Sequence, residues 1–223
     1  MGGAIARGLS TCDLFRPQDI TVINRRASKT AEIQEFNPEL QAVTGDYSSL
    51  ATAYIVVIAV KPWIVEALIK EHLTGKRPVY RYYSTQRPDG QIVISVAAGI
   101  FLEQLQTWAG KDRALYCAIP NTAIEVKQSM TFITGLNATE DQNRLVLNIF
   151  GALGKAELVE ERLLGPATLL RYRLRLPLYP GSDGGRGRAG PLPAKSQGRR
   201  SANPARGDRL ARIQRLAPRT GGG

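Results

Sequence analysis

The residues of this chain that could carry chemistry stand directly after a run of apolar residues. Residues 55–60 read Ile-Val-Val-Ile-Ala-Val, and Lys61 and Pro62 follow them. A short run rich in β-branched residues is typical of a strand buried on both faces, as in a parallel sheet covered by helices. Ligands of such sheets bind at the carboxyl ends of the strands. We therefore expect a ligand site around Ala59, Val60, Lys61 and Pro62.

Two further runs show the same pattern. Residues 92–96 lead into the small residues 97–99, and residues 114–119 lead into Pro120–Thr122. Small residues let a ligand lie close to the backbone, whereas the amide and hydroxyl groups of Asn121 and Thr122 can form hydrogen bonds. Because carboxyl ends of parallel strands share one edge of a sheet, the three runs predict a single site at that edge.

The elements that must position these residues alternate along the chain. The pattern predicts strands at 19–23, 55–60, 92–96, 114–119 and 130–134. It predicts helices at 3–9, 28–36, 63–71, 101–108 and 140–150, with Ser28 capping the second helix and Ser48 or Ser49 capping a short turn. Alternation of this kind predicts an α/β fold with right-handed βαβ units.

The charge of the chain is concentrated at its C-terminal end. Residues 171–223 hold 13 Lys and Arg against 2 acids, which equals the net charge of +11 of the whole chain, so residues 1–170 are neutral. The same segment holds 10 of the 22 glycines and 6 of the 13 prolines. Such a composition cannot offset the entropy of ordering, so a disordered tail is expected, with at most a short helix at 208–216.

Several other functions are disfavoured by the sequence. The two cysteines, Cys12 and Cys117, suggest no disulfide framework, and Cys117 fits a packed thiol in an apolar strand. His72, the one histidine, is expected at the surface without a catalytic partner. No metal site is predicted. An apolar run of about 20 residues and a signal peptide are both lacking, so we expect a soluble, cytoplasmic protein without a membrane partner.

Five motifs, in order, resemble the signatures of pyrroline-5-carboxylate reductase: Met1–Leu9, Asn24–Arg25, Ala59–Pro62, Ala97–Ile100 and Pro120–Thr122. The resemblance runs from Met1 to about Leu164. It implies reduction of the cyclic imine 1-pyrroline-5-carboxylate to proline with NAD(P)H. It also implies a Rossmann-type parallel sheet at 1–165, which binds the dinucleotide, followed by a helical domain that dimerises and completes the substrate site.

The same resemblance implies the roles of individual residues. Gly2 matches the third glycine of the dinucleotide fingerprint, so the strand before it is expected to be missing. Arg25 and Arg26 stand where an acid would select NAD, which favours NADPH, with NADH as the alternative cofactor; an ordinary solvated basic loop is the competing interpretation. No catalytic residue can be named. The expected cofactor-binding residues are Gly2, Asn24, Arg25, Asp46, Ala59, Val60, Lys61, Pro62, Ala97, Ala98, Gly99 and Asn121.

Residues 166–223 depart from the family pattern. They have no Ser/Gly-rich entry or long apolar helix of a dimerisation domain, so the homo-oligomer of the family is expected to be lost and the activity impaired. Out-of-frame translation fits the excess of Arg over Lys, and a nucleic-acid-binding tail, which we do not favour, is the competing explanation. A non-catalytic dinucleotide-binding fragment is the alternative function. A missing first strand should also leave its neighbours with unpaired edges.

Overall fold

A computed structural model of the chain describes residues 1–74, 90–164 and 209–213. Most of the predicted tail and the expected domain boundary near 165 lie outside the described residues. Within the described ranges, no helix combines the length and the apolar character needed to cross a membrane.

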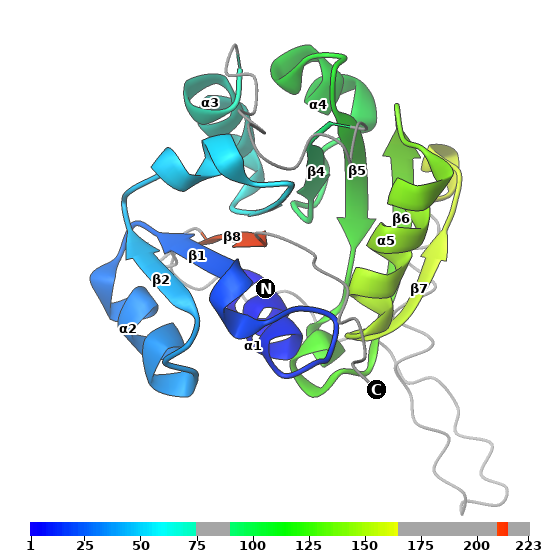
Figure 1. Cartoon of the computed structure of the whole chain (residues 1–223). Helices are drawn as coiled ribbons and strands as arrows, with labels where there is room; N and C mark the ends of the chain where they lie inside the picture. The colour runs from blue at the N-terminus through cyan, green and yellow to red at the C-terminus, as the bar shows by residue number, and fades with distance from the viewer. Residues whose placement is uncertain (75–89, 165–208, 214–223) are drawn as a thin grey trace, which may run out of the picture.

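A mixed sheet forms the centre of the molecule, in the order β2-β1-β8-β3-β4-β5-β6-β7 (Figure 1). The strands are β1 (Ile20–Asn24), β2 (Gln41–Thr44), β3 (Ile55–Ala59), β4 (Ile92–Ser95), β5 (Ala114–Ile119), β6 (Ser129–Leu136), β7 (Gly154–Leu158) and β8 (Arg209–Ile213). Strands β1 and β2 pair in parallel, as do β3, β4 and β5. The expected α/β fold with a largely parallel sheet is confirmed.

Helices cover both faces of this sheet. They are α1 (Gly2–Ser10), α2 (Ala27–Phe36), α3 (Pro62–His72), α4 (Leu102–Ala109) and α5 (Glu140–Gly151), with 3-10 turns η1 (Pro17–Asp19), η2 (Ser48–Thr52) and η3 (Thr122–Val126). Helices α1, α2 and α5 supply apolar residues to one core cluster, and α3 and α4 to the other. Because every residue of β1 is buried, its alternating side chains contribute to both cores.

The order of β5 and β6 differs from a simple βαβ repeat. Strand β6 runs antiparallel to β5, with Ile119 paired to Phe132, and β7 then pairs with β6 in parallel. The link between β5 and β6 holds only the turn η3, whereas a parallel crossover needs a dozen or more residues. The start of β6 therefore lies at the same edge of the sheet as the end of β5.

Local capping differs from the expectation in two places. Ser28 does not cap α2, because Arg26 is the N-cap residue and Ser28 lies inside the helix. The turn η2 has Tyr47 as its N-cap residue, so neither Ser48 nor Ser49 caps it. In contrast, Thr139 caps α5 with a capping box, in which its hydroxyl accepts from the backbone N–H of Gln142.

The expected unpaired edges are not found. Strand β8 lies between β1 and β3 and pairs antiparallel with both along all five of its residues. Residues 209–213 thus form a strand, and the short helix expected at 208–216 is wrong for this part. Extended backbone here satisfies the hydrogen-bonding groups of two buried strands, which outweighs the weak helical preference of the local sequence.

Candidate functional site

The carboxyl ends of β1, β2, β3, β4 and β5 lie at one edge of the sheet. In the sheet, β1 and then β2 lie on one side of β8, and β3, β4 and β5 lie in turn on the other side. The order of the strands along the chain therefore runs outward in opposite directions from this position. Such a reversal of strand order is where open α/β sheets bind ligands. The sequence did not indicate that β8 would start at this edge, where Arg209 pairs with Asn24 and Ala59.

The turn after β1 is shaped by a buried amide. Asn24 is only 3% exposed, and its Oδ1 accepts a hydrogen bond of 3.0 Å from the backbone N–H of Arg26. Its carbonyl also accepts from the N–H of Gly45 at 3.0 Å, which ties β1 to the end of β2. Arg25, which lies between Asn24 and Arg26 in the turn, is exposed. Asn24 thus fixes the backbone of the turn, and Arg25 presents a cation at the edge.

Asp46 organises the turn after β2. Its Oδ1 accepts a hydrogen bond of 2.8 Å from the backbone N–H of Ser48. Hydrogen bonds from Ser48, chiefly from its backbone, lower the pKa of the Asp46 carboxyl below its ordinary value. The carboxylate therefore holds the start of η2, the role that the sequence had assigned to Ser48 or Ser49.

The end of β3 combines small residues with a cation. Ala59 is half-buried, Val60 is 9% exposed, and Lys61 is exposed. Lys61 is the N-cap residue of α3, and Pro62 takes the first helical position, which suits its fixed backbone angle. The ammonium of Lys61 lies 5.7 Å from the ring centre of Trp63, whose side chain is 76% exposed. This contact holds the cation beside the edge of the sheet.

The end of β4 leaves backbone open to a ligand. The backbone N–H of Ala97 donates to the Oγ of Ser95 at 3.3 Å, which turns the chain. Ala98 and Gly99 are exposed. Gly99 has a φ of +79°, and a Cβ built at this residue would meet no atom within 4 Å. Open space over a glycine in a left-handed conformation is suited to the close approach of a flat ligand.

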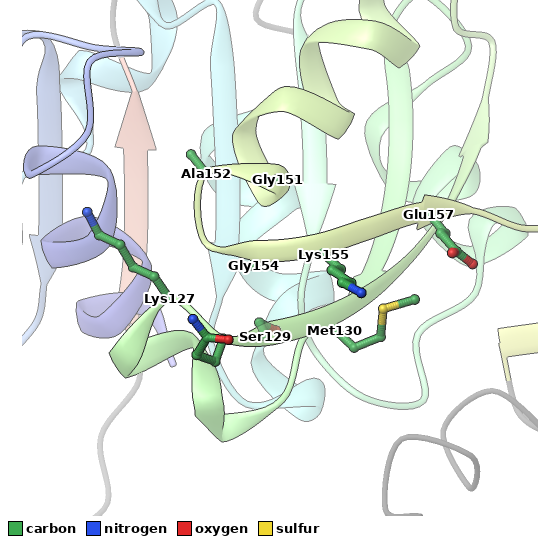
Figure 2. Close-up of a pocket in the computed structure, with 9 residues that line it drawn as sticks. Lys127, Ser129, Met130, Gly151, Ala152, Gly154, Lys155 and Glu157 are labelled. Carbon is green, nitrogen blue, oxygen red and sulfur yellow. The ribbon is translucent and has the colours of Figure 1, made fainter. Parts of the chain in front are cut away.

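The end of β5 adjoins a surface depression of about 600 Å³. Asn121 caps η3, since its Oδ1 accepts from the backbone N–H of Ala123 at 3.0 Å, and its own N–H donates to the Oγ of Ser129 at 3.2 Å. Ser129 lines the depression, together with Lys127, Gln128, Met130, Gly151, Ala152, Gly154, Lys155 and Glu157. Figure 2 shows Met130, Lys155 and Glu157 projecting from the same side of β6 and β7.

Gly2 is placed differently from the other predicted site residues. It is buried in the first turn of α1, which packs against β8 and against η3. Two contacts fix that helix beyond the end of β5: Arg7 pairs with Glu125, and the Nζ of Lys127 donates to the carbonyl of Thr11 at 2.9 Å. The remaining predicted residues all stand at the ends of β1, β2, β3, β4 and β5.

The structure also describes the surroundings of Cys117 and His72, for which the sequence predicted no catalytic role. Cys117 is 4% exposed, its Sγ donates to the carbonyl of Ile100 at 3.3 Å, and burial raises the pKa of the thiol to about 12, so it is a packed thiol as predicted. His72 is half-buried and stacks on Tyr47, with ring centres 4.1 Å apart, so the expected surface position is wrong. Stacking on an aromatic ring accounts for its burial.

Comparisons with known proteins agree with this geometry. A family model described as NADP oxidoreductase, coenzyme F420-dependent, matches residues 1–99. Pyrroline-5-carboxylate reductase of Escherichia coli (strain K12) is 30% identical over 167 residues, which cover 74% of this chain and 58% of that protein. The enzyme of Arabidopsis thaliana is 26% identical over 170 residues, which cover 75% of this chain and 56% of that protein. The resemblance to pyrroline-5-carboxylate reductase is confirmed.

Solved structures of pyrroline-5-carboxylate reductases share the fold. The enzyme of Streptococcus pyogenes superposes with a TM-score of 0.60 at 22% identity, covering 75% of this chain and 57% of that one. The Plasmodium falciparum enzyme, solved with NADP bound, superposes with a TM-score of 0.58 at 20% identity, covering 77% of this chain and 62% of that one. The present chain therefore spans somewhat more than half the length of the Escherichia coli and Arabidopsis thaliana enzymes.

Proposed function

We propose that this chain binds NADPH at the carboxyl edge of its sheet and serves the reduction of 1-pyrroline-5-carboxylate to proline. One observation carries the proposal: exposed Arg25 and the open backbone at Gly99 flank, at one edge, the position where the strand order reverses. The named function of the curated relatives supports the same reaction. The small-molecule substrate and the predicted cytoplasmic location belong to this proposal.

The residues at this edge fit a dinucleotide phosphate. Arg25 offers a planar cation suited to a 2′-phosphate, and Asn24 holds the turn that presents it. The small residues Ala97, Ala98 and Gly99 leave space for the flat nicotinamide end, and Asn121 closes that side. The middle of the cofactor, between its 2′-phosphate and nicotinamide ends, would be lined by Ala59, Val60, Lys61 and Pro62. Asp46 would support the turn beside Arg25. When bound, NADPH supplies the hydride for imine reduction.

The proposal includes impaired turnover. We assign no catalytic residue among those described. We accordingly propose that this chain binds the cofactor without measurable reduction and without forming regular dimers.

A titration with both cofactors tests the binding site. Arg25→Ala should weaken NADPH binding by about 1.5–3 kcal/mol, as expected for hydrogen bonds to a charged group, and leave NADH binding nearly unchanged. Arg16→Ala is the matched control, because Arg16 pairs with Asp19 next to the opposite end of β1. Equal losses for both cofactors would refute the assignment of Arg25. Turnover of 1-pyrroline-5-carboxylate, measured by NADPH absorbance, separates a working enzyme from a binding fragment.

A further inference from the structure

Among the large apolar residues in the described ranges, Trp63 has the most exposed side chain, at 76%. It is the second residue of α3, whose buried residues pack into one of the two core clusters: Val65, Leu68 and Ile69. Trp63 instead shares the exposed stripe of the helix with Glu66 and Lys70, which form an ion pair at 2.6 Å. A large ring on a polar stripe adds nothing to the core, and such exposure is typical of a contact to a ligand or partner.

The place of Trp63 in the helix directs its ring over the edge of the sheet. Side chains of an α-helix tilt toward its N-terminus, and the N-terminus of α3 adjoins the carboxyl end of β3. The ammonium of Lys61, which precedes the helix, lies 5.7 Å from the centre of the ring. The ring of Trp63 therefore stands at the same edge as the candidate site.

A second exposed ring at this edge helps to decide which part of a dinucleotide Trp63 would meet. Phe101 is 55% exposed and precedes α4, two residues after Gly99. One strand separates β1 from β3, which corresponds to about 10 Å between their ends, and β4 lies one strand further away. Trp63 is thus closer in strand order to Arg25 than Phe101 is. Because adenine is attached to the ribose that carries the 2′-phosphate, Trp63 is placed on the adenine side and Phe101 on the nicotinamide side.

We propose that Trp63 is the residue on which the adenine of NADPH stacks. The inference rests on the proposed binding of NADPH and adds a contact to the base, which Arg25 does not supply. A tryptophan ring stabilises a base by contact of two flat faces, without a hydrogen bond of fixed direction. The cation of Lys61 beside the ring complements the negative charge of the adjoining phosphates.

Titration of the full-length chain with adenosine 2′,5′-bisphosphate, the adenine half of the cofactor, tests this contact. Trp63→Ala should weaken binding of this probe roughly tenfold, as for the loss of one stacked base, and Trp63→Phe should retain most of the affinity. Phe101→Ala is the matched control, because it removes an exposed ring from the same edge, and it should leave the affinity unchanged. Equal affinities of the wild type and Trp63→Ala would overturn the proposal, as would an equal loss in Phe101→Ala.

Tryptophan fluorescence supplies a second readout. The chain has two tryptophans, and Trp108 lies in the last turn of α4, at the opposite edge of the sheet. In Trp108→Phe only Trp63 emits, and saturating adenosine 2′,5′-bisphosphate should quench this emission. Since the probe does not absorb where tryptophan emits, quenching requires contact between base and ring. Trp63→Phe, which retains Trp108, should show no quenching, and the reverse pattern would contradict stacking on Trp63.

The same titrations separate this inference from the proposed function. A wild type that binds both the probe and NADPH, with unchanged affinities in Trp63→Ala, would refute the stacking contact and leave the NADPH site standing. A wild type that binds neither molecule would refute the NADPH site, and the stacking contact with it.

Discussion

Arg113 donates a hydrogen bond of 3.0 Å from its Nε to the Oε1 of Gln91, and both side chains are buried. Arg113 also donates to the carbonyls of Leu73 and Ala109, at the ends of α3 and α4, at 2.8 and 2.5 Å. The amide of Gln91 donates in turn to the carbonyls of Leu50 and Ala53. The pair therefore joins the amino ends of β4 and β5 to both helices and to η2, at the edge opposite the candidate site.

Arg113→Met should destabilise the fold strongly. Its removal leaves the buried Gln91 oxygen and two helix-terminal carbonyls without their donor, so we expect a loss of about 2–4 kcal/mol in the free energy of unfolding. Urea denaturation of the wild type and the variant measures this loss. The control is Arg144→Met, because Arg144 is 71% exposed in a pair with Asp141 and its replacement should change stability by about 0.5 kcal/mol or less. Equal effects of the two substitutions would contradict a structural role of Arg113.

Gly99→Ala should weaken cofactor binding without a special effect on stability. Gly99 and Gly110 have φ angles of +79° and +86°, and a Cβ at either meets no atom within 4 Å, so each substitution should add backbone strain of roughly 1–3 kcal/mol without a steric clash. Only Gly99 lies at the proposed NADPH edge, since Gly110 follows the end of α4. Titration of the two variants with NADPH should show a loss for Gly99→Ala alone. A similar loss in Gly110→Ala would remove Gly99 from the site.

Gly154→Ala should be severely destabilising. Gly154 begins β7 with a φ of +142°, and a Cβ at this residue would lie 2.1 Å from the carbonyl oxygen of Ser129. Ser129 and Gly154 pair with each other and both line the depression, as the close-up in Figure 2 shows, so neither backbone can withdraw without breaking the β6–β7 pairing. Gly151→Ala is the matched control in the same depression, because its Cβ meets nothing within 4 Å at the end of α5. Thermal melting of both variants should show a large loss only for Gly154→Ala.

Cys117 should make stability depend on alkaline pH. Burial raises the pKa of its thiol from 9.0 to about 12, so the folded protein holds this proton when the unfolded chain has released it. The stabilisation is complete below pH 9 and is lost as the pH rises toward 12. Between pH 8.5 and 10, the free energy of unfolding should fall by about 1 kcal/mol more in the wild type than in Cys117→Ala. Rapid labelling of both thiols in the native protein at pH 8 would contradict this burial.

The sequence predicted those elements whose signals are local. The apolar run at 55–60 became β3, and Lys61 and Pro62 became the start of α3, because a buried strand and a proline at the first helical position depend on few neighbours. Strands β2 and β7 were missed, since their residues are mostly exposed or half-buried and form no apolar run. The alternation of strands and helices along the chain predicts a parallel sheet. The gathering of the site residues at one edge of the sheet followed from that parallel order.

What the sequence could not show depends on contacts between distant residues. Serine is a common residue at the N-cap of a helix, so Ser28 was expected there. The buried Asn24 amide sets the turn before α2, however, and the helix starts earlier. His72 looked like a surface residue because its stacking partner, Tyr47, lies far away in the sequence. Strand β8 has a mixed apolar and basic sequence in a segment rich in Arg, Gly and Pro, and only the buried edges of β1 and β3 give it a partner.

The position of β8 also determines the order in which the domain can form. During synthesis, β1 and β3 leave the ribosome long before residues 209–213, so the two halves of the sheet must wait for their central member. Closing so long a loop makes this pairing slow compared with the local βα units. The nascent chain thus passes through an interval in which the backbone groups along one edge of β1 and one edge of β3 lack strand partners, and the rate of translation sets how long that interval lasts.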